Sequence, residues 1–87
     1  MNKLRLFSSN NCMKCLKLLN SFKKLNISNF EYIDVFLDEN QEFCDSYNVD
    51  EIPHLQIVNS KGDVEKNIIG ICSKKQLENI IKYYKIK

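Results

Sequence analysis

The sequence lacks any apolar stretch long enough to cross a membrane as a helix. Its first apolar run, around Leu4 and Phe7, is also too short for a signal peptide, so we expect a cytoplasmic protein with no membrane partner. Lysine and arginine exceed aspartate and glutamate by only two, 13 against 11, and the lysines are interleaved with acids. A nucleic acid is therefore not expected as a partner either.

Proline, glycine and tryptophan are scarce as well: the 87 residues include one proline, two glycines and no tryptophan. The chain has no linker, internal repeat or low-complexity segment, and its length suits one small domain, residues 1–87. No long apolar stripe is left over for a further surface, so we expect a monomer.

Cysteine, in contrast, occurs four times. Four cysteines could form the disulfide framework of a small secreted domain. The absence of a signal sequence argues against that framework, and so does an apolar content of 44%, which is sufficient for a core. A reducing cytoplasm, in which thiols persist, is the better expectation.

Two of the cysteines form the motif Cys12-Met13-Lys14-Cys15, where a short apolar strand passes into an amphipathic helix. Side chains three residues apart on a helical turn share one face, so the two sulfur atoms can meet. The free N–H groups and the positive dipole end of a helix start favour a thiolate, which is the species that attacks a disulfide. We therefore predict a redox pair, with Cys12 as the nucleophile and the better covered Cys15 as the resolving thiol. Half of a zinc site, or two unrelated thiols, are the alternatives.

Hydrophobic periodicity predicts alternating strands and helices in the order βαβαββα. The polar loop 8–11 could supply the cap of the first helix, whose apolar stripe includes Leu16 and Phe22, and Ser73 to Gln76 has the form of a capping box. The helix between the first two strands should make them parallel. The expected elements are a strand at 3–7, a helix from 12 that fades near 26–29, a strand at 30–36, a helix at 38–47, strands at 54–58 and 64–69, and a helix after Ser73.

This order, with Cys-x-x-Cys at the first strand-to-helix turn and Ile52-Pro53 before the third strand, resembles the thioredoxin/glutaredoxin family over nearly the whole chain. The stretch from Tyr32 to Leu77, with its Lys61-Gly62 turn, is closer to thioredoxins. The resemblance implies an α/β thioredoxin fold with a four-stranded mixed sheet flanked by three helices. It also implies a compact form, without the extra N-terminal strand and helix of full-length thioredoxins.

The resemblance further implies which residues surround the cysteine pair. In the family, the proline that matches Pro53 is cis, and the residue before it offers its backbone to an extended substrate segment. Without the resemblance, Pro53 is a turn proline before an edge strand. The matching glycine, Gly70, lies beside the cysteines and lets a substrate approach. The expected substrate-binding residues are Asn11, Met13, Lys14, Glu51, Ile52, Pro53, Gly70 and Ile71, with Ile33 beside Ile71 in an apolar rim.

The chain departs from the family pattern at several positions. Met13 and Lys14 replace the Gly-Pro of thioredoxins and the Pro-Tyr of glutaredoxins, so the reduction potential is not assigned. Leu6 stands in place of the buried acid of thioredoxins, so the proton relay of that acid is absent or carried by water. The start of the last helix, residues 70–74, lacks the second glycine and the acids with which glutaredoxins hold glutathione.

The leading prediction is a small dithiol–disulfide oxidoreductase that reduces protein disulfides, with no cofactor beyond its redox-active Cys12–Cys15 disulfide. Its electron donor would be a thioredoxin reductase-type flavoenzyme or glutathione, and a glutathione-dependent glutaredoxin is the alternative. A second class is a metal- or cluster-binding module, and a third is an interaction domain without chemistry. The metal module would use Cys12 and Cys15 with Cys44, Cys72 or His54. Cys44 and Cys72 are nevertheless expected as packed thiols, and His54 as a half-buried strand residue.

Overall fold

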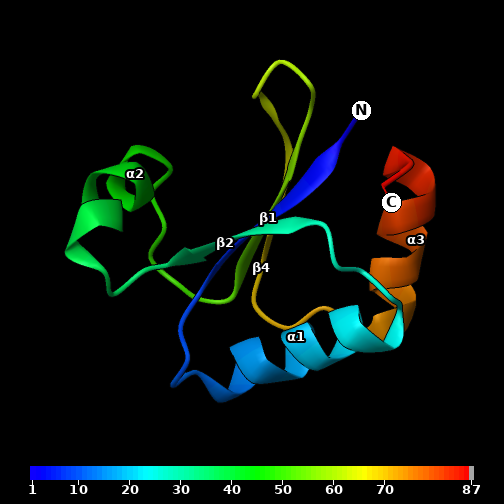
Figure 1. The fold of residues 1–87 in the computed structure, drawn as a ribbon, viewed down its shortest axis with the longest axis horizontal. Coiled ribbons are helices and arrows are strands. Elements are labelled where there is room, and N and C mark those ends of the chain that lie inside the picture. The colour runs from blue at the N-terminus through cyan, green and yellow to red at the C-terminus, as the bar shows by residue number, and fades with distance from the viewer. Residues whose placement is uncertain (87) are drawn as a thin grey trace.

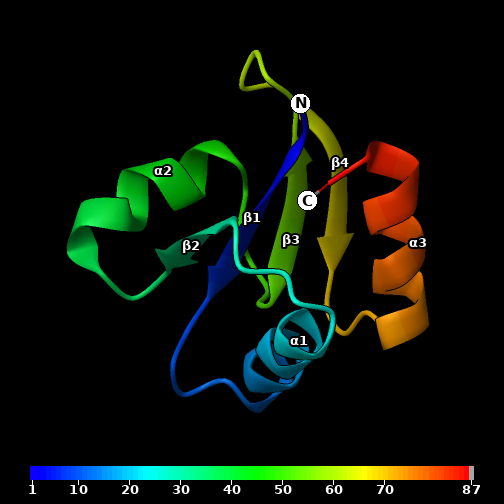
Figure 2. The same ribbon diagram turned by 45° about the vertical axis from the view of Figure 1, so that its right-hand side comes forward.

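The strands form one mixed sheet in a computed structural model that describes residues 1–86. β1 (Lys3–Ser8) and β2 (Phe30–Asp34) are parallel neighbours. β3 (His54–Val58) pairs antiparallel with β1, and β4 (Val64–Ile69) pairs antiparallel with β3. The strand order is therefore β2-β1-β3-β4. Figure 1 shows the fold, and Figure 2 shows the four strands side by side in this order.

The helices connect these strands in the predicted order. α1 (Met13–Lys24) joins the two parallel strands, and α3 (Lys74–Tyr84) follows β4. Between β2 and β3 lie a short 3₁₀ helix, η1 (Asp38–Asn40), and α2 (Gln41–Ser46). The predicted thioredoxin fold, with three α-helices around a four-stranded mixed sheet, is confirmed. Within residues 1–86, no helix has the length and apolar character needed to span a bilayer.

Each face of the sheet is covered by helix (Figure 2). Because side chains alternate along a strand, β1 sends Leu4 and Leu6 to one face and Phe7 to the other. The first face packs on α1 and α3, and the second packs on α2. The larger core includes Leu4, Leu6, Leu18, Phe22, Leu55, Ile57 and Leu77, and the smaller core includes Phe7, Ile33 and Cys44.

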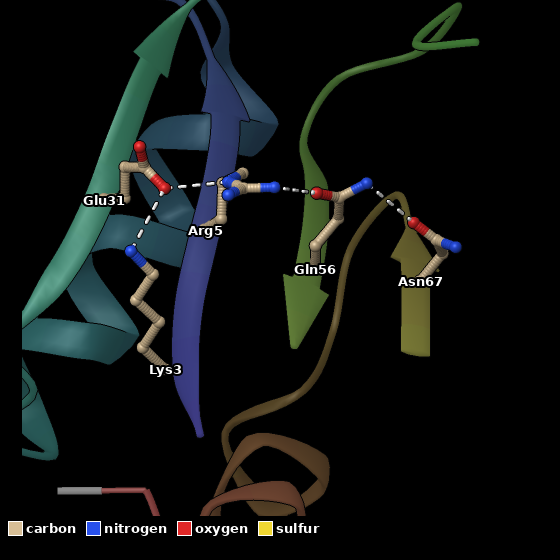
Figure 3. A network of polar contacts seen from close by, with 5 residues as sticks. All are labelled: Lys3, Arg5, Glu31, Gln56 and Asn67. Atoms are coloured by element: carbon tan, nitrogen blue, oxygen red, sulfur yellow. Dashed lines mark hydrogen bonds and ion pairs between the residues drawn. The ribbon is translucent and has the colours of Figure 1, made fainter. Parts of the chain in front are cut away.

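A row of polar side chains crosses all four strands on the α2 side of the sheet (Figure 3). Arg5 is only 8% exposed, and its guanidinium lies 5.0 Å from the centre of the Phe43 ring. Its Nε donates to Glu31 Oε1 at 2.7 Å, and its terminal nitrogen donates to Gln56 Oε1 at 3.1 Å. Gln56 in turn donates to Asn67 Oδ1 at 3.1 Å. A buried charge needs such partners, and this row supplies them to the Arg5 guanidinium inside the fold.

Several predicted element boundaries were wrong. β1 extends to Ser8 instead of ending at residue 7, and the helix predicted at 38–47 is divided into η1 and α2. β2 ends at Asp34 instead of residue 36, because the Asp34 carboxylate accepts the N–H of Phe36 at 3.0 Å and turns the chain. α1 begins at Met13 and is capped by Cys12 instead of by a residue of the loop 8–11. The predicted capping box of α3 is confirmed, since Ser73 and Gln76 make both of its hydrogen bonds.

Candidate active site

The sheet brings three separate segments to one of its ends. Phe7, near the end of β1, pairs with His54 at the start of β3, and His54 pairs with Ile69 at the end of β4. The loop that leads to Cys12, the Ile52-Pro53 segment and Gly70 extend from those three positions. Gly70 N donates to Pro53 O at 2.8 Å, and the Ile52–Pro53 peptide bond is cis.

Glycine is required at position 70 by its backbone conformation. Its φ is +88°, in the left-handed region that other residues rarely adopt. A Cβ atom at this position would meet no other atom within 4 Å, so the space beside Gly70 is open.

Cys12 is the N-cap of α1, and its sulfur performs the capping. Cys12 Sγ accepts the backbone N–H of Cys15 at 3.2 Å. Burial acts to raise the pKa of the Cys12 thiol, but hydrogen bonds from the Cys15 thiol and from the N–H groups of Cys15 and Lys14, together with the Lys14 charge, bring this pKa below its usual value. The site therefore favours a thiolate at a partly exposed position, as a helix N-terminus does in general.

Cys15 has the opposite character. It is fully buried on the inner side of α1, and burial raises the pKa of its thiol, as do the hydrogen bond and charge of Cys12. The Ser8 hydroxyl and the backbone N–H of Ser9 act the other way and lower this pKa. An accessible thiol with a lowered pKa beside a buried thiol with a raised one fits an attacking Cys12 and a resolving Cys15.

The predicted substrate-binding residues differ in exposure. Met13 is 69% exposed, and Asn11, Lys14, Glu51 and Ile71 are exposed as well. Ile52 and Gly70 are half-buried, and Pro53 is buried.

The predicted apolar rim needs one correction, because Ile33 is buried under α2 against Phe7 and cannot belong to an exposed surface. Leu16 belongs to the exposed surface beside Cys12, which hydrophobic periodicity does not predict. Periodicity places Leu16 in the inner stripe of α1, but the residue is 46% exposed. The available signal was its spacing, because a residue four positions after Cys12 lies on the same side of the helix as the nucleophile.

The remaining thiols and the single histidine, all in the described part of the chain, form no metal-binding cluster with the pair. Cys44 and Cys72 are buried, and burial raises the pKa of both thiols. His54 was expected to be half-buried, but it is buried, because it packs on the Phe7 ring on the α2 side of the sheet, with its Nε2 2.8 Å from Asn67 Oδ1. Among residues 1–86, no three histidine, cysteine, aspartate or glutamate side chains converge in a way that could hold a metal ion.

The fold and the cysteine pair together define a thioredoxin-fold protein with a dithiol at the N-terminus of its first helix. The chain belongs to the thioredoxin family, because the family model for thioredoxin matches residues 3–83. No curated protein matches the chain. Family membership and the adjacent cysteines support a thiol–disulfide oxidoreductase.

Solved structures agree with this assignment. A mutant thioredoxin from Halobacterium salinarum is 26% identical, with a TM-score of 0.79 over 95% of this chain and 74% of that one. The reduced thioredoxin of Schistosoma mansoni is 23% identical, with a TM-score of 0.76 over 95% of this chain and 78% of that one. A protein described only as malarial is 17% identical, with a TM-score of 0.77 over 97% of both chains. The last two are similar in fold.

Proposed function

We propose that this protein is a thioredoxin-like dithiol oxidoreductase that reduces disulfide bonds of other proteins in the cytoplasm. The observation that carries the proposal is the Cys12 sulfur at the N-terminus of α1, which accepts the Cys15 N–H at 3.2 Å while the Cys15 thiol lies buried behind it. One sulfur is accessible for attack, and the other is protected until a mixed disulfide has formed.

The reaction proceeds in two exchanges. The Cys12 thiolate attacks one sulfur of the substrate disulfide, that bond breaks, and the other substrate sulfur leaves as a thiolate that takes up a proton. Cys15 then loses its proton and attacks the Cys12 sulfur of the mixed disulfide. The Cys12–Cys15 disulfide forms, the second substrate thiolate leaves, and the substrate has gained two electrons. A reductase-type flavoenzyme or a small thiol returns two electrons to the pair.

The surface around Cys12 suits a protein substrate. Exposed apolar side chains of Met13, Leu16 and Ile71 can contact apolar parts of a substrate segment. The backbone of Ile52, beside the buried Pro53, can pair with that segment as a strand does at a sheet edge. The polar members of this surface are Asn11, Lys14 and Glu51, and Gly70 leaves open space beside it.

The start of α3 supports a thioredoxin-like activity over a glutathione-dependent one. Glutathione would bring a carboxylate, for which free N–H groups at a helix N-terminus are a natural site. Here Ser73 Oγ already accepts the N–H of Gln76 at 3.1 Å, and the Gln76 side chain accepts the N–H of Ser73 at 2.9 Å. Two of the donors that an incoming carboxylate would need are therefore used within the chain.

A coupled reduction assay tests the proposal. With a disulfide-containing protein as substrate, we expect turnover when NADPH and a thioredoxin reductase-type flavoenzyme supply electrons, and far slower turnover with glutathione and its reductase. Cys12→Ser should abolish turnover, and Cys15→Ser should trap a mixed disulfide with the substrate. Cys44→Ala, which removes a thiol buried elsewhere, is the matched control and should retain activity. Faster turnover with glutathione would show a glutaredoxin, and no turnover with either donor would refute the proposal.

A further inference from the structure

Ser8 is the last residue of β1 and has a buried hydroxyl that the reaction described above does not use. Alternation along the strand places it on the same face as Leu4 and Leu6, the face that α1 covers. Its side chain is fully buried, and its Oγ makes no well-formed hydrogen bond in the dithiol protein. A buried hydroxyl without a partner is costly, so its position calls for an explanation.

The Cys15 sulfur is the group that this hydroxyl approaches. The Ser8 hydroxyl and the backbone N–H of Ser9 both act to lower the pKa of the Cys15 thiol, and Ser8 and Cys15 are both fully buried where β1 passes into α1. The other buried side-chain atom without a partner in the described chain is His54 Nδ1, on the face of the sheet that α2 covers. Leu6, two residues before Ser8, is fully buried in the apolar core, so that position supplies no carboxylate to Cys15.

The Cys15 sulfur needs a hydrogen-bond donor most when Cys12 is held in the mixed disulfide with a substrate. In the free dithiol protein, the hydrogen bond and charge of Cys12 oppose ionisation of Cys15. Once Cys12 is bound to a substrate sulfur, its negative charge is gone, and burial is the main obstacle that remains. A neutral donor held close to the Cys15 sulfur then stabilises the thiolate as it forms, because it hydrogen-bonds the charged state better than the thiol.

From this geometry we propose that Ser8 is a catalytic residue of the resolving step, whose hydroxyl donates a hydrogen bond to the Cys15 thiolate while that thiolate attacks the mixed disulfide. The inference rests on the proposed oxidoreductase function. Ser8 keeps its own proton, and the Cys15 proton passes to solvent. The S–S bond between Cys12 and the substrate breaks as the Cys12–Cys15 bond forms. The backbone N–H of Ser9 is the second donor to the same sulfur.

Stopped-flow absorbance can separate the two steps when the substrate is a small aromatic disulfide. Such a substrate releases one coloured thiolate at each of the two exchanges. The first phase reports attack by Cys12 and the second reports attack by Cys15. Ser8→Ala should leave the first phase within about twofold of the wild type and slow the second by roughly 10- to 100-fold, the range expected for one hydrogen bond to a charged group. The pH midpoint of the second phase should move upward, since the thiolate has lost a donor.

Ser8→Thr and Ser8→Val form a matched pair, because their side chains have nearly the same shape and only threonine carries the hydroxyl. We expect threonine to retain the second phase with its wild-type pH midpoint and valine to behave like alanine. Equal second-phase rates and midpoints in both variants, or equal slowing of both phases, would overturn the role of Ser8 and leave the proposed function intact. A wild-type protein without any second phase would overturn both.

Discussion

Several groups act on the Cys12 sulfur at the start of α1. Burial acts to raise the pKa of the Cys12 thiol, but the Cys15 thiol, the N–H groups of Cys15 and Lys14, and the Lys14 charge lower it. The N–H groups belong to the helix and stay in place in any side-chain variant. The charge of Lys14 is separable, because its side chain is exposed and projects from the same helical turn.

Replacement of Lys14 by methionine should raise the pH midpoint of Cys12 alkylation slightly, since the thiolate loses a nearby positive charge. The shift should shrink as salt is added, because the lysine is exposed and its charge is screened. The rate of alkylation by iodoacetamide as a function of pH measures this midpoint. Lys17→Met removes an equivalent charge one turn further along α1 and should have a smaller effect. Equal shifts in the two variants would contradict a specific role for Lys14.

Glu31, the β2 member of the polar row across the sheet, makes the free energy of unfolding depend on pH. The hydrogen bond from Arg5 outweighs burial and holds the pKa of the Glu31 carboxyl below its usual value of 4.5. A carboxyl whose pKa is lower in the folded state stabilises the fold above its unfolded pKa, and this contribution is lost as the pH falls through the folded value.

Glu31→Gln should therefore lower the free energy of unfolding at neutral pH, and the difference from the wild type should vanish in acid below the folded pKa. Because the Glu31 side chain is 38% exposed, solvent screening limits the loss to about 1 kcal/mol. Urea unfolding across the acid range measures it. Glu65→Gln, at an exposed glutamate of β4, is the control and should show no such difference. A constant difference at all pH values would argue against the linkage.

Not every residue of the site could be predicted from the sequence. The spacing of Cys12 and Cys15 is informative by itself, because the chemistry requires two sulfurs on one helical turn. Periodicity predicts Leu16 in the core, but the residue is 46% exposed. An apolar stripe gives no information on how far the sheet extends beneath a helix. Ile33 was assigned to the surface, although α2 packs over the end of β2 and buries it.

The cap of α1 is an element-scale feature that sequence preferences did not predict. Oxygen side chains are the usual helix caps, and the loop before Cys12 offers several of them. The Ser8 hydroxyl instead turns inward toward Cys15, and Ser9 Oγ accepts the N–H of Asn11 at 3.3 Å within the loop. The Cys12 sulfur therefore caps α1, and the same atom is the proposed nucleophile.

The cap of α3, in contrast, followed from its sequence, and its contribution can be measured. Ser73→Ala removes the acceptor for the Gln76 N–H and should cost about 1 kcal/mol of stability by urea unfolding. Ser60→Ala, in the exposed turn between β3 and β4, is the control and should change little. Unchanged stability in Ser73→Ala would show that the box contributes nothing to the fold.

The topology of the whole molecule explains how residues far apart in sequence meet at one end of the sheet. Parallel pairing of β1 and β2 followed from the intervening helix, and antiparallel pairing of β3 and β4 from the turn between two apolar runs. These local rules do not fix the register between β1 and β3. That register places Phe7 opposite His54 and so brings Pro53 to the end of the sheet where the Cys12 loop begins.

The same limit applies to the polar row across the sheet. Arg5, Gln56 and Asn67 belong to three strands, and no local pattern in the sequence joins them. Their contacts depend on two registers at once, which only the folded chain defines. Long-range pairing therefore decides both the buried polar contacts and the assembly of the site.

The most direct test of the redox function is the reduction potential of the Cys12–Cys15 couple. The protein is equilibrated with glutathione buffers over a range of potentials, free thiols are alkylated, and the fraction of disulfide is read by mass spectrometry. We predict one reversible two-electron transition at about −270 mV, without a stable glutathione adduct on Cys12. A transition at about −200 mV with a trapped adduct would instead indicate a glutathione-dependent enzyme. If no reversible disulfide formed at any potential, the account of Cys12 and Cys15 as a redox pair would be contradicted.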